Sequence, residues 1–295
     1  MKQLAEFFVR SAIQAAVIVA LLEASLIFAW AGAAIVALWI LRFGFNAAMP
    51  VVFAGIAGSA VWALQGELGP ISNLFAVAVL ASVLRSTRSW SITLFFLPLA
   101  LGGFNFALQY GAPNYVEGSH QLLTQVFEQF KQDFVEQLNS ANAPAERIEE
   151  VGDWQVPDRW SMLGWFAAVQ AMMSILSLLV ARWWQAVLYN PGGFATEMSA
   201  LRFEIGSAVG LILLAGLLFT NYDGNWWSLS WLGLCILPLA FVGFVQAQYL
   251  VKRRGSMLWK VLFYAMLLMW FPFSLGALAL LALFDAFIGK VRRSH

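Results

Sequence analysis

The chain is a succession of long apolar segments interrupted by one long polar run, residues 111–159. Of its 295 residues 61% are hydrophobic and 11% charged, whereas a soluble domain carries roughly 25% charged residues. A water-soluble core of this length cannot bury so much apolar surface, but a bilayer can. In lipid every backbone amide needs an internal partner, so spanning segments form helices or closed barrels. Barrel strands alternate polar and apolar residues, while these apolar runs are continuous and rich in Ala and Leu, which predicts helices.

Ten apolar segments are candidate membrane helices, since a span needs about 20 apolar residues and fewer when its neighbours shield it. They cover residues 7–22, 24–41, 46–64, 70–84, 90–110, 160–181, 205–220, 227–249, 257–271 and 273–289. Pro272 separates the last two, because proline removes an amide donor and disfavours helix at the residue before it. A hairpin or a broken helix is expected there. The sequence predicts an all-α polytopic membrane protein with eight to ten transmembrane helices and one extracytoplasmic helical insert.

The distribution of cations predicts the orientation, because cytoplasmic loops are enriched in Lys and Arg. With ten spans and the N-terminus inside, 14 of the 17 cations are cytoplasmic, and the C-terminus is cytoplasmic as well. The run 111–159 then lies outside, with nine of the 16 acidic residues and only Lys131, Arg147 and Arg159 as cations.

Three domains follow from this topology. A five-span bundle covers residues 1–110, the acidic insert covers 111–159, and a second membrane bundle covers 160–295. The second bundle contains a cytoplasmic connector at 182–204.

The insert is predicted to be helical. Apolar residues recur at helical spacing from Gln121 to Leu138, and a short second helix is expected at 145–151. Three roles remain open for the first helix. The helix either packs on the outer surface of the protein, or covers an outward-facing cavity as a lid, or docks a partner.

The connector combines turn residues with an amphipathic segment. Asn190-Pro191-Gly192-Gly193 favours a turn, and the apolar residues from Phe194 onward favour a helix at the inner membrane surface. It is either a plain link between spans or a docking surface for a partner. The docking residues would be Arg182, Trp183, Asn190, Pro191, Gly192, Gly193, Phe194 and Arg202.

Two further charged features lie near the C-terminus. Lys252, Arg253 and Arg254 precede Gly255 and a new span, which is typical of a topology determinant that contacts lipid phosphates. Asp285 lies in the last span, and with Lys290 close by an ion-pair or capping role is favoured over a proton relay.

A few neutral polar residues lie inside the spans, where amides bind a solute or, more commonly, join helices to each other. Four amides and two tryptophans at outer or middle positions are the candidates for an outward-opening pocket. They are Trp62, Gln65, Asn105, Gln109, Trp165 and Gln170.

Several function classes are disfavoured by what the sequence holds. Cys235 is the single cysteine and His120 and His295 are the only histidines, so neither an intramolecular disulfide nor a metal site is expected. A net charge of +1 gives no case for nucleic acid. No protease or transferase constellation is visible within the spans, so no catalytic residue, no cofactor and no enzyme activity are predicted.

Part of the chain resembles a known family. The stretch 181–194, the run Lys252 to Gly255, and Leu283-Phe284-Asp285 before Lys290, Arg292 and Arg293 are similar to the proteobacterial branch of the YybS-like DUF2232 membrane proteins. The resemblance covers about residues 160–293, and the acidic insert departs from the family pattern. The resemblance implies a bacterial inner-membrane protein. With the orientation that the cations predict, the insert lies in the periplasm.

The resemblance also implies a fold similar to the S components of energy-coupling-factor transporters. Those proteins capture vitamins or metal ions from outside and dock on a transmembrane T component with two ATPases. An Ala-xxx-Ala face on their first span meets the T component, and Ala12 and Ala16 have that spacing here. As in that family, no ATPase motif is visible in this chain.

Two functions are therefore expected as alternatives. The first is a solute-binding, S-component-like subunit of a transporter, with a T component and ATPases as partners and a small molecule as ligand. The second is a membrane scaffold or regulator that binds other membrane or cytoplasmic proteins through the connector, the basic turn and the insert.

Overall fold

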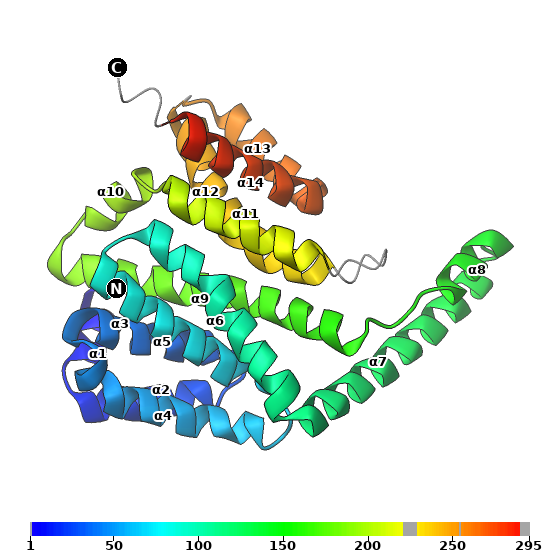
Figure 1. Cartoon of the computed structure of the whole chain (residues 1–295), viewed down its shortest axis with the longest axis horizontal. Helices are drawn as coiled ribbons and strands as arrows, with labels where there is room; N and C mark the ends of the chain where they lie inside the picture. Colours follow the sequence, from blue (N-terminus) through cyan, green and yellow to red (C-terminus); the bar gives the residue numbers. More distant parts are fainter. Residues whose placement is uncertain (1, 221–228, 254, 290–295) are drawn as a thin grey trace.

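A computed structural model describes residues 2–220, 229–253 and 255–289. Within these ranges the chain forms fourteen α-helices and no strand (Figure 1). The first half contains α1 (Lys2–Val9), α2 (Ala12–Glu23), α3 (Ala29–Phe43), α4 (Phe45–Ala63), α5 (Gly69–Thr87), α6 (Trp90–Gly111), α7 (Pro113–Ser140) and α8 (Ala145–Gly152). The second half contains α9 (Arg159–Tyr189), α10 (Gly193–Ser199), α11 (Ile205–Phe219), α12 (Ser230–Arg253), α13 (Met257–Met269) and α14 (Phe271–Ile288).

Each predicted apolar segment falls on a helix, but not every segment is a straight span. The segment 7–22 is divided between α1 and α2, which meet at an angle of 108°. Ser11 between them has an extended backbone, which ends the first helix. Helices α13 and α14 meet at 119°, with Pro272 in the first turn of α14, in agreement with the predicted break.

Five helices are long and apolar enough to cross a membrane: α4, α5, α6, α9 and α12. The number is seven if each bent pair counts as one span. It is smaller than the predicted eight to ten because α3 and α11 have 15 residues each, or about 22 Å of helix against a hydrocarbon core of about 30 Å. The chain is a helical multi-pass membrane protein.

The short helix α3 lies at the centre of the first bundle. It packs against α2, α4, α5 and α9, and 11 of its 15 residues are buried. A helix surrounded by protein in this way does not need to match the thickness of the bilayer. Helix α12 packs against α9, α14 packs against α12, and both contact α13.

The bundle has two distinct ends. At one, which we call the arm end, α7 and α8 project from the bundle as an arm (Figure 1). The turns 24–28 and 64–68 belong to this end, since Trp62 Nε1 donates to Ala24 O and Leu68 N donates to the Tyr115 hydroxyl at the base of α7. At the other, the basic end, Arg85 donates to the last carbonyls of α3, and α10 lies there (Figure 1).

The boundaries of two predicted elements are corrected. Helix α9 continues to Tyr189, so Arg182 and Trp183 lie on this helix rather than in a loop. The expected amphipathic helix is the seven-residue α10, and Leu201 and Phe203 beyond it are buried against the bundle. Helix α7 begins at Pro113 rather than Gln121, because proline is well suited to the first turn of a helix.

Candidate solute-binding site at the arm end

A pocket of about 270 Å³ lies between the bundle and the base of the arm. Its walls come from three stretches that are far apart in sequence: the turn 66–72, residues 104–126 of α6 and α7, and residues 162–170 of α9. Most of the lining is apolar, with a few polar side chains among it. This combination is typical of a site for a small organic molecule.

Three side chains of the bundle supply polar groups to this pocket. Ser72 is buried, and its Oγ is without a hydrogen-bond partner in the described part of the chain. Asn105 is also buried and donates from Nδ2 to Leu101 O at 2.9 Å, which fixes the amide in place. Gln170 of α9 completes the set. A buried hydroxyl with no partner is costly, so a ligand that bonds to it gains affinity.

A second, smaller cavity of about 160 Å³ adjoins the first. The two share Glu67, Gly69 and Gln170 in their linings, so Gln170 lies between them. Asn73 of α5 lines the smaller cavity and accepts a hydrogen bond of 2.9 Å from Ser174 Oγ on α9. This bond holds α5 against α9 beside the site.

The base of the arm is attached to the bundle by polar contacts. Leu68 N donates to the Tyr115 hydroxyl at 3.2 Å, Glu117 forms an ion pair with Arg159, and His120 Nε2 lies 2.9 Å from Pro157 O. Burial raises the pKa of Tyr115 above its usual value, with the nearby Glu67 carboxylate adding to the effect. Tyr115 is therefore neutral at physiological pH.

The outer part of the arm has its own small core. Lys131 Nζ donates to Trp154 O at 3.1 Å, and the rings of Phe134 and Trp154 stack with centroids 5.8 Å apart. These contacts hold the chain after α8 along the outer half of α7. The whole of α7 has 28 residues and is about 42 Å long. Only the first turns of α7 reach the pocket.

Of the six residues that the sequence predicts for a pocket, two line this pocket and four do not. Asn105 and Gln170 line the pocket. Four residues lie outside its lining: Trp62, Gln65, Gln109 and Trp165. Trp62 donates to Ala24 O in the turn 24–28. Gln65 is exposed in the turn after α4 and donates back to Val61 O.

Ser72, Tyr115, Ser119 and Glu67 line the pocket but were not predicted from the sequence. Tyr115 and Ser119 fall in the polar run, which indicated a position outside the membrane rather than next to a site. Ser72 follows Gly69-Pro70 at the start of a helix, and this turn chemistry is the only sequence signal that points to it.

Glu23 is a further polar residue to which the sequence assigned no role. It is fully buried at the end of α2, where Ser59 Oγ of α4 donates to its Oε2 at 2.9 Å. Its Oε1 has no partner among the described residues. A Cβ added at Gly32 would lie 2.8 Å from that oxygen, so a residue without a side chain makes room for the carboxyl.

At the basic end the connector is held to the bundle by its own polar groups. The Arg182 guanidinium pairs with the Glu197 carboxylate of α10, and Glu204 N donates to Ser91 Oγ at 2.8 Å. Gly192 has φ +88° in the turn between α9 and α10, a conformation that glycine adopts without strain. Asn190 and Pro191 form the start of this turn, and Gly193 begins α10.

Arg202 also takes part in these contacts. Its Nε lies 3.4 Å from Asp285 Oδ2, and Gln246 Nε2 donates to the same oxygen at 3.1 Å. The ion-pair role predicted for Asp285 is confirmed, with Arg202 as its partner. Lys290, Arg292 and Arg293 lie outside the described residues, as does Arg254.

Ala20, at the C-terminal end of the small-residue face of α2, packs closely against α4. A Cβ on Gly58 of α4 would lie 2.4 Å from Ala20 O, which shows how closely these helices approach. Ala15 and Val19 are fully buried, and Ala12 and Ala16 are half-buried beside them.

Within the described ranges no three His, Cys, Asp or Glu side chains are grouped so that they could hold a metal ion. Comparison of the chain with protein-family models, curated proteins and solved structures finds no match.

Proposed function

We propose that this protein is a solute-binding membrane component, and that its solute binds in the pocket under the base of α7. The observation that carries the proposal is the buried Ser72 hydroxyl without a partner, which lies in one pocket with Asn105 and Gln170. Buried polar groups in native proteins are normally hydrogen-bonded. A bound polar molecule would provide the missing partner.

The lining defines the class of solute. Among the described residues that line the pocket, Glu67 is the one with a charge, and its Oε1 already accepts from Gly69 N at 3.0 Å. None of these lining residues is a cation that could neutralise an anion. The proposed ligand is a small uncharged or amine-bearing organic molecule with an apolar body.

The first turns of α7 are proposed to act as the lid. Val116 is buried, while Leu122 and Val126 are 61% and 66% exposed although they line the pocket. The pocket is thus covered at the N-terminal turn of α7 and open further out. Movement of α7 about Ala112 would widen or close this opening.

The proposed topology and partners are those expected from the sequence. In this proposal both termini and the basic end lie in the cytoplasm of a bacterial cell, and the arm lies in the periplasm. The chain has no catalytic role in this proposal and needs a T component with ATPases as partners. The resemblance of the sequence to the YybS-like DUF2232 family, and through it to S components, motivates this part of the proposal, with Ala12 and Ala16 at the docking face.

Thermal unfolding of the purified protein in mild detergent tests the proposal. The panel contains water-soluble vitamins, amino acids, nucleosides and polyamines. A ligand is expected to raise Tm by about 3 °C or more at saturating concentration. If no compound of the panel shifts Tm, the solute-binding proposal is contradicted.

Matched variants locate the effect. Asn105→Leu and Gln170→Leu are expected to abolish the shift, because each removes polar groups from the pocket. Gln65→Leu makes the same kind of change at an exposed amide outside the lining and is expected to keep it. A shift that survives in both pocket variants would place the ligand elsewhere.

A scaffold role is the second candidate, and one observation favours it. Leu122, Val126 and Phe130 lie at four-residue spacing on α7 and are 54–66% exposed, which forms an apolar stripe suited to another helix. Purification of the tagged protein from native membranes distinguishes the two roles. Co-purification of a T component and its ATPases supports transport, whereas a partner lost on Val126→Glu and Phe130→Glu supports a scaffold.

A further inference from the structure

The C-terminal helices form a two-part site at the basic end that has no part in the proposed solute pocket. The first part is a pocket of about 720 Å³ between α10, α12 and α13. Lys252, Arg253 and Lys260 line it together with aromatic residues, and none of the described residues in its lining is a carboxylate. Within the described residues none of these three cations has an ion-pair partner.

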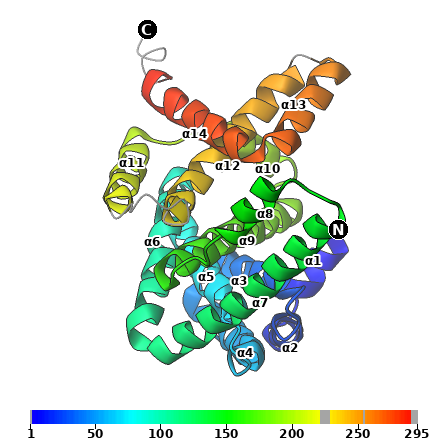
Figure 2. The same ribbon diagram turned by 90° about the vertical axis from the view of Figure 1, so that its right-hand side faces the viewer.

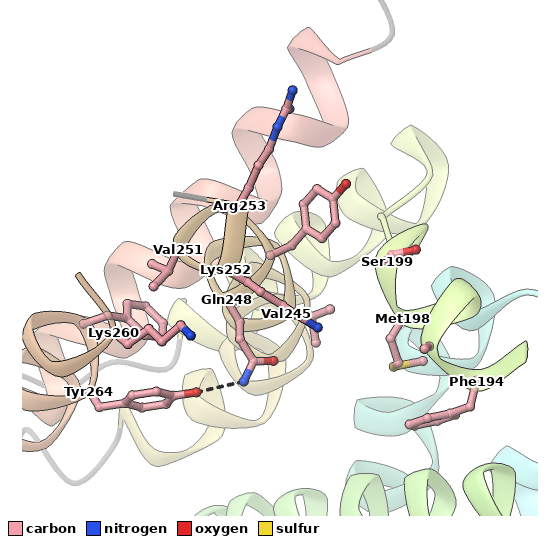
Figure 3. A pocket seen from close by; sticks show the side chains of 13 residues that line it. Phe194, Met198, Ser199, Val245, Gln248, Val251, Lys252, Arg253, Lys260 and Tyr264 are labelled. Atoms are coloured by element: carbon pink, nitrogen blue, oxygen red, sulfur yellow. Dashed lines mark hydrogen bonds between the residues drawn. The ribbon is translucent and has the colours of Figure 1, made fainter. Parts of the chain in front are cut away.

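The polar side chains of this pocket are arranged around one hydrogen bond. Gln248 Nε2 donates to the Tyr264 hydroxyl at 2.9 Å, which joins α12 to α13. Figure 3 shows Lys252 and Lys260 on either side of Gln248, while Phe194 and Met198 of α10 stand across from them. Two uncompensated ammonium groups on one cavity favour an anion between them.

The second part is an apolar groove of about 410 Å³ between α9, α12 and the α13–α14 pair. It is lined by Leu237, Phe241, Leu267, Leu275 and other apolar side chains. Its polar members are Ser274, whose hydroxyl donates to Met266 O, and Tyr264. The groove suits a hydrocarbon chain and little else.

Tyr264 joins the two parts because it lines both. Beside it, Phe244 of the groove and Phe263 of the cationic pocket stack with centroids 6.0 Å apart. Helix α13 contains no buried residue, and it diverges from α14 (Figure 2). The open wedge between α13, α14 and α12 therefore continues from the cationic pocket into an apolar space.

We propose that this two-part site binds a single anionic phospholipid, with its phosphate between Lys252 and Lys260 and an acyl chain in the groove. Charge complementarity selects the headgroup, and no carboxylate among the described lining residues competes for the cations. The lipid would fill the wedge and stabilise α13, which otherwise has few contacts with the bundle.

Native mass spectrometry of the full chain in mild detergent tests this proposal. The protein is titrated with phosphatidylglycerol and, separately, with phosphatidylethanolamine of the same acyl chains. One phosphatidylglycerol per chain is expected to bind about tenfold more tightly than phosphatidylethanolamine, because only the former has a net negative charge. Equal affinity for the two lipids would overturn the proposal.

Two pairs of variants examine the two parts of the site. Lys252→Gln with Lys260→Gln is expected to remove the preference for phosphatidylglycerol, whereas Lys2→Gln with Lys131→Gln, the same charge change elsewhere, keeps it. Leu267→Trp fills the groove and is expected to weaken both lipids, whereas Leu262→Trp on the same helix lies outside the lining and does not. Identical behaviour within either pair contradicts the assignment of that part.

Competition with glycerol 3-phosphate distinguishes a site for a lipid from a site for a free phosphate compound. It has the headgroup chemistry but no acyl chain, so it is expected to displace the lipid only at concentrations far above that of the lipid. Displacement at equal concentration would show an anion site without a role for the groove, which would overturn the lipid proposal.

Discussion

Glu23 shows how a buried carboxyl is accommodated among apolar helices. Its single hydrogen bond comes from Ser59, and no cation pairs with it in the described part of the chain. An unpaired buried charge is very costly. We therefore expect the shape of the Glu23 side chain and its bond with Ser59 to matter here, and not a negative charge. A polar residue at such a position in a membrane protein is also a candidate for function.

Substitution of Glu23 is expected to separate shape from charge. Glu23→Gln retains an acceptor for Ser59 and should change the free energy of unfolding by less than about 1 kcal/mol. Glu23→Ala leaves a cavity and an unpaired Ser59 hydroxyl and should cost about 2–4 kcal/mol. Thermal unfolding measures both, with Glu6→Ala at an exposed position as the control. Equal loss in the Gln and Ala variants would show that the negative charge itself is needed.

Tyr115 predicts a pH dependence of the contact between α7 and the bundle. Burial raises its pKa in the docked state above the value of about 10 in an unfolded chain. Neutral Tyr115 therefore stabilises the docking of α7 fully below pH 10. This stabilisation is lost as the pH rises through the higher pKa of the docked state.

Spin labels measure this effect. In a Cys235→Ala background, labels at Gln125→Cys on α7 and Gln65→Cys on the bundle should show a single distance below pH 10 and a broader distribution above it. Tyr115→Phe has no group that titrates there and should show no such change with pH. A wild-type distribution that stays constant up to pH 12 would contradict the role of Tyr115.

At the scale of elements, the contact between α12 and α14 depends on a residue without a side chain. A Cβ on Gly243 would lie 1.8 Å from Leu278 O, so the helices must separate to accept one. Gly243→Ala is expected to lower Tm by several degrees and to loosen α14. Gly103→Ala on α6 meets no atom within 4 Å and should leave Tm unchanged or raise it, since alanine favours helix. Equal Tm values in the two variants would show that the helices do not approach this closely.

The sequence predicted the helices well because long apolar runs in lipid have few alternatives. It did not predict the angle between α1 and α2, because that bend depends on the backbone of Ser11 alone. It also gave α7 a later start, since the polar residues 113–120 break the apolar periodicity without breaking the helix.

The candidate pocket was only partly predictable. Asn105 and Gln170 stood out because amides are rare in apolar segments. Ser72 and Tyr115 did not, because neither residue type is unusual where it lies. The pocket itself arises from stretches that meet only after α5, α6, α7 and α9 have packed, and spacing along the chain does not show such a meeting.

In the whole molecule, the two proposed ligand sites lie at opposite ends of one bundle. The proposed solute site is at the arm end under α7, and the proposed lipid site is at the basic end between α12 and α13. Both proposals require the arm end to face outward and the basic end to face the cytoplasmic leaflet, where anionic lipids meet cationic side chains.

Cysteine labelling in intact cells with a membrane-impermeant maleimide tests both the orientation of the arm end and the solute site. Cysteines are introduced at Ser119, which lines the pocket, and at Gln65, which is exposed at the same end, both in the Cys235→Ala background. Both are expected to react from outside, and the solute that raises Tm should protect Ser119→Cys but not Gln65→Cys. Labelling of either cysteine only after the membrane is permeabilised would contradict the orientation, and equal labelling of Ser119→Cys with and without the solute would contradict the solute site.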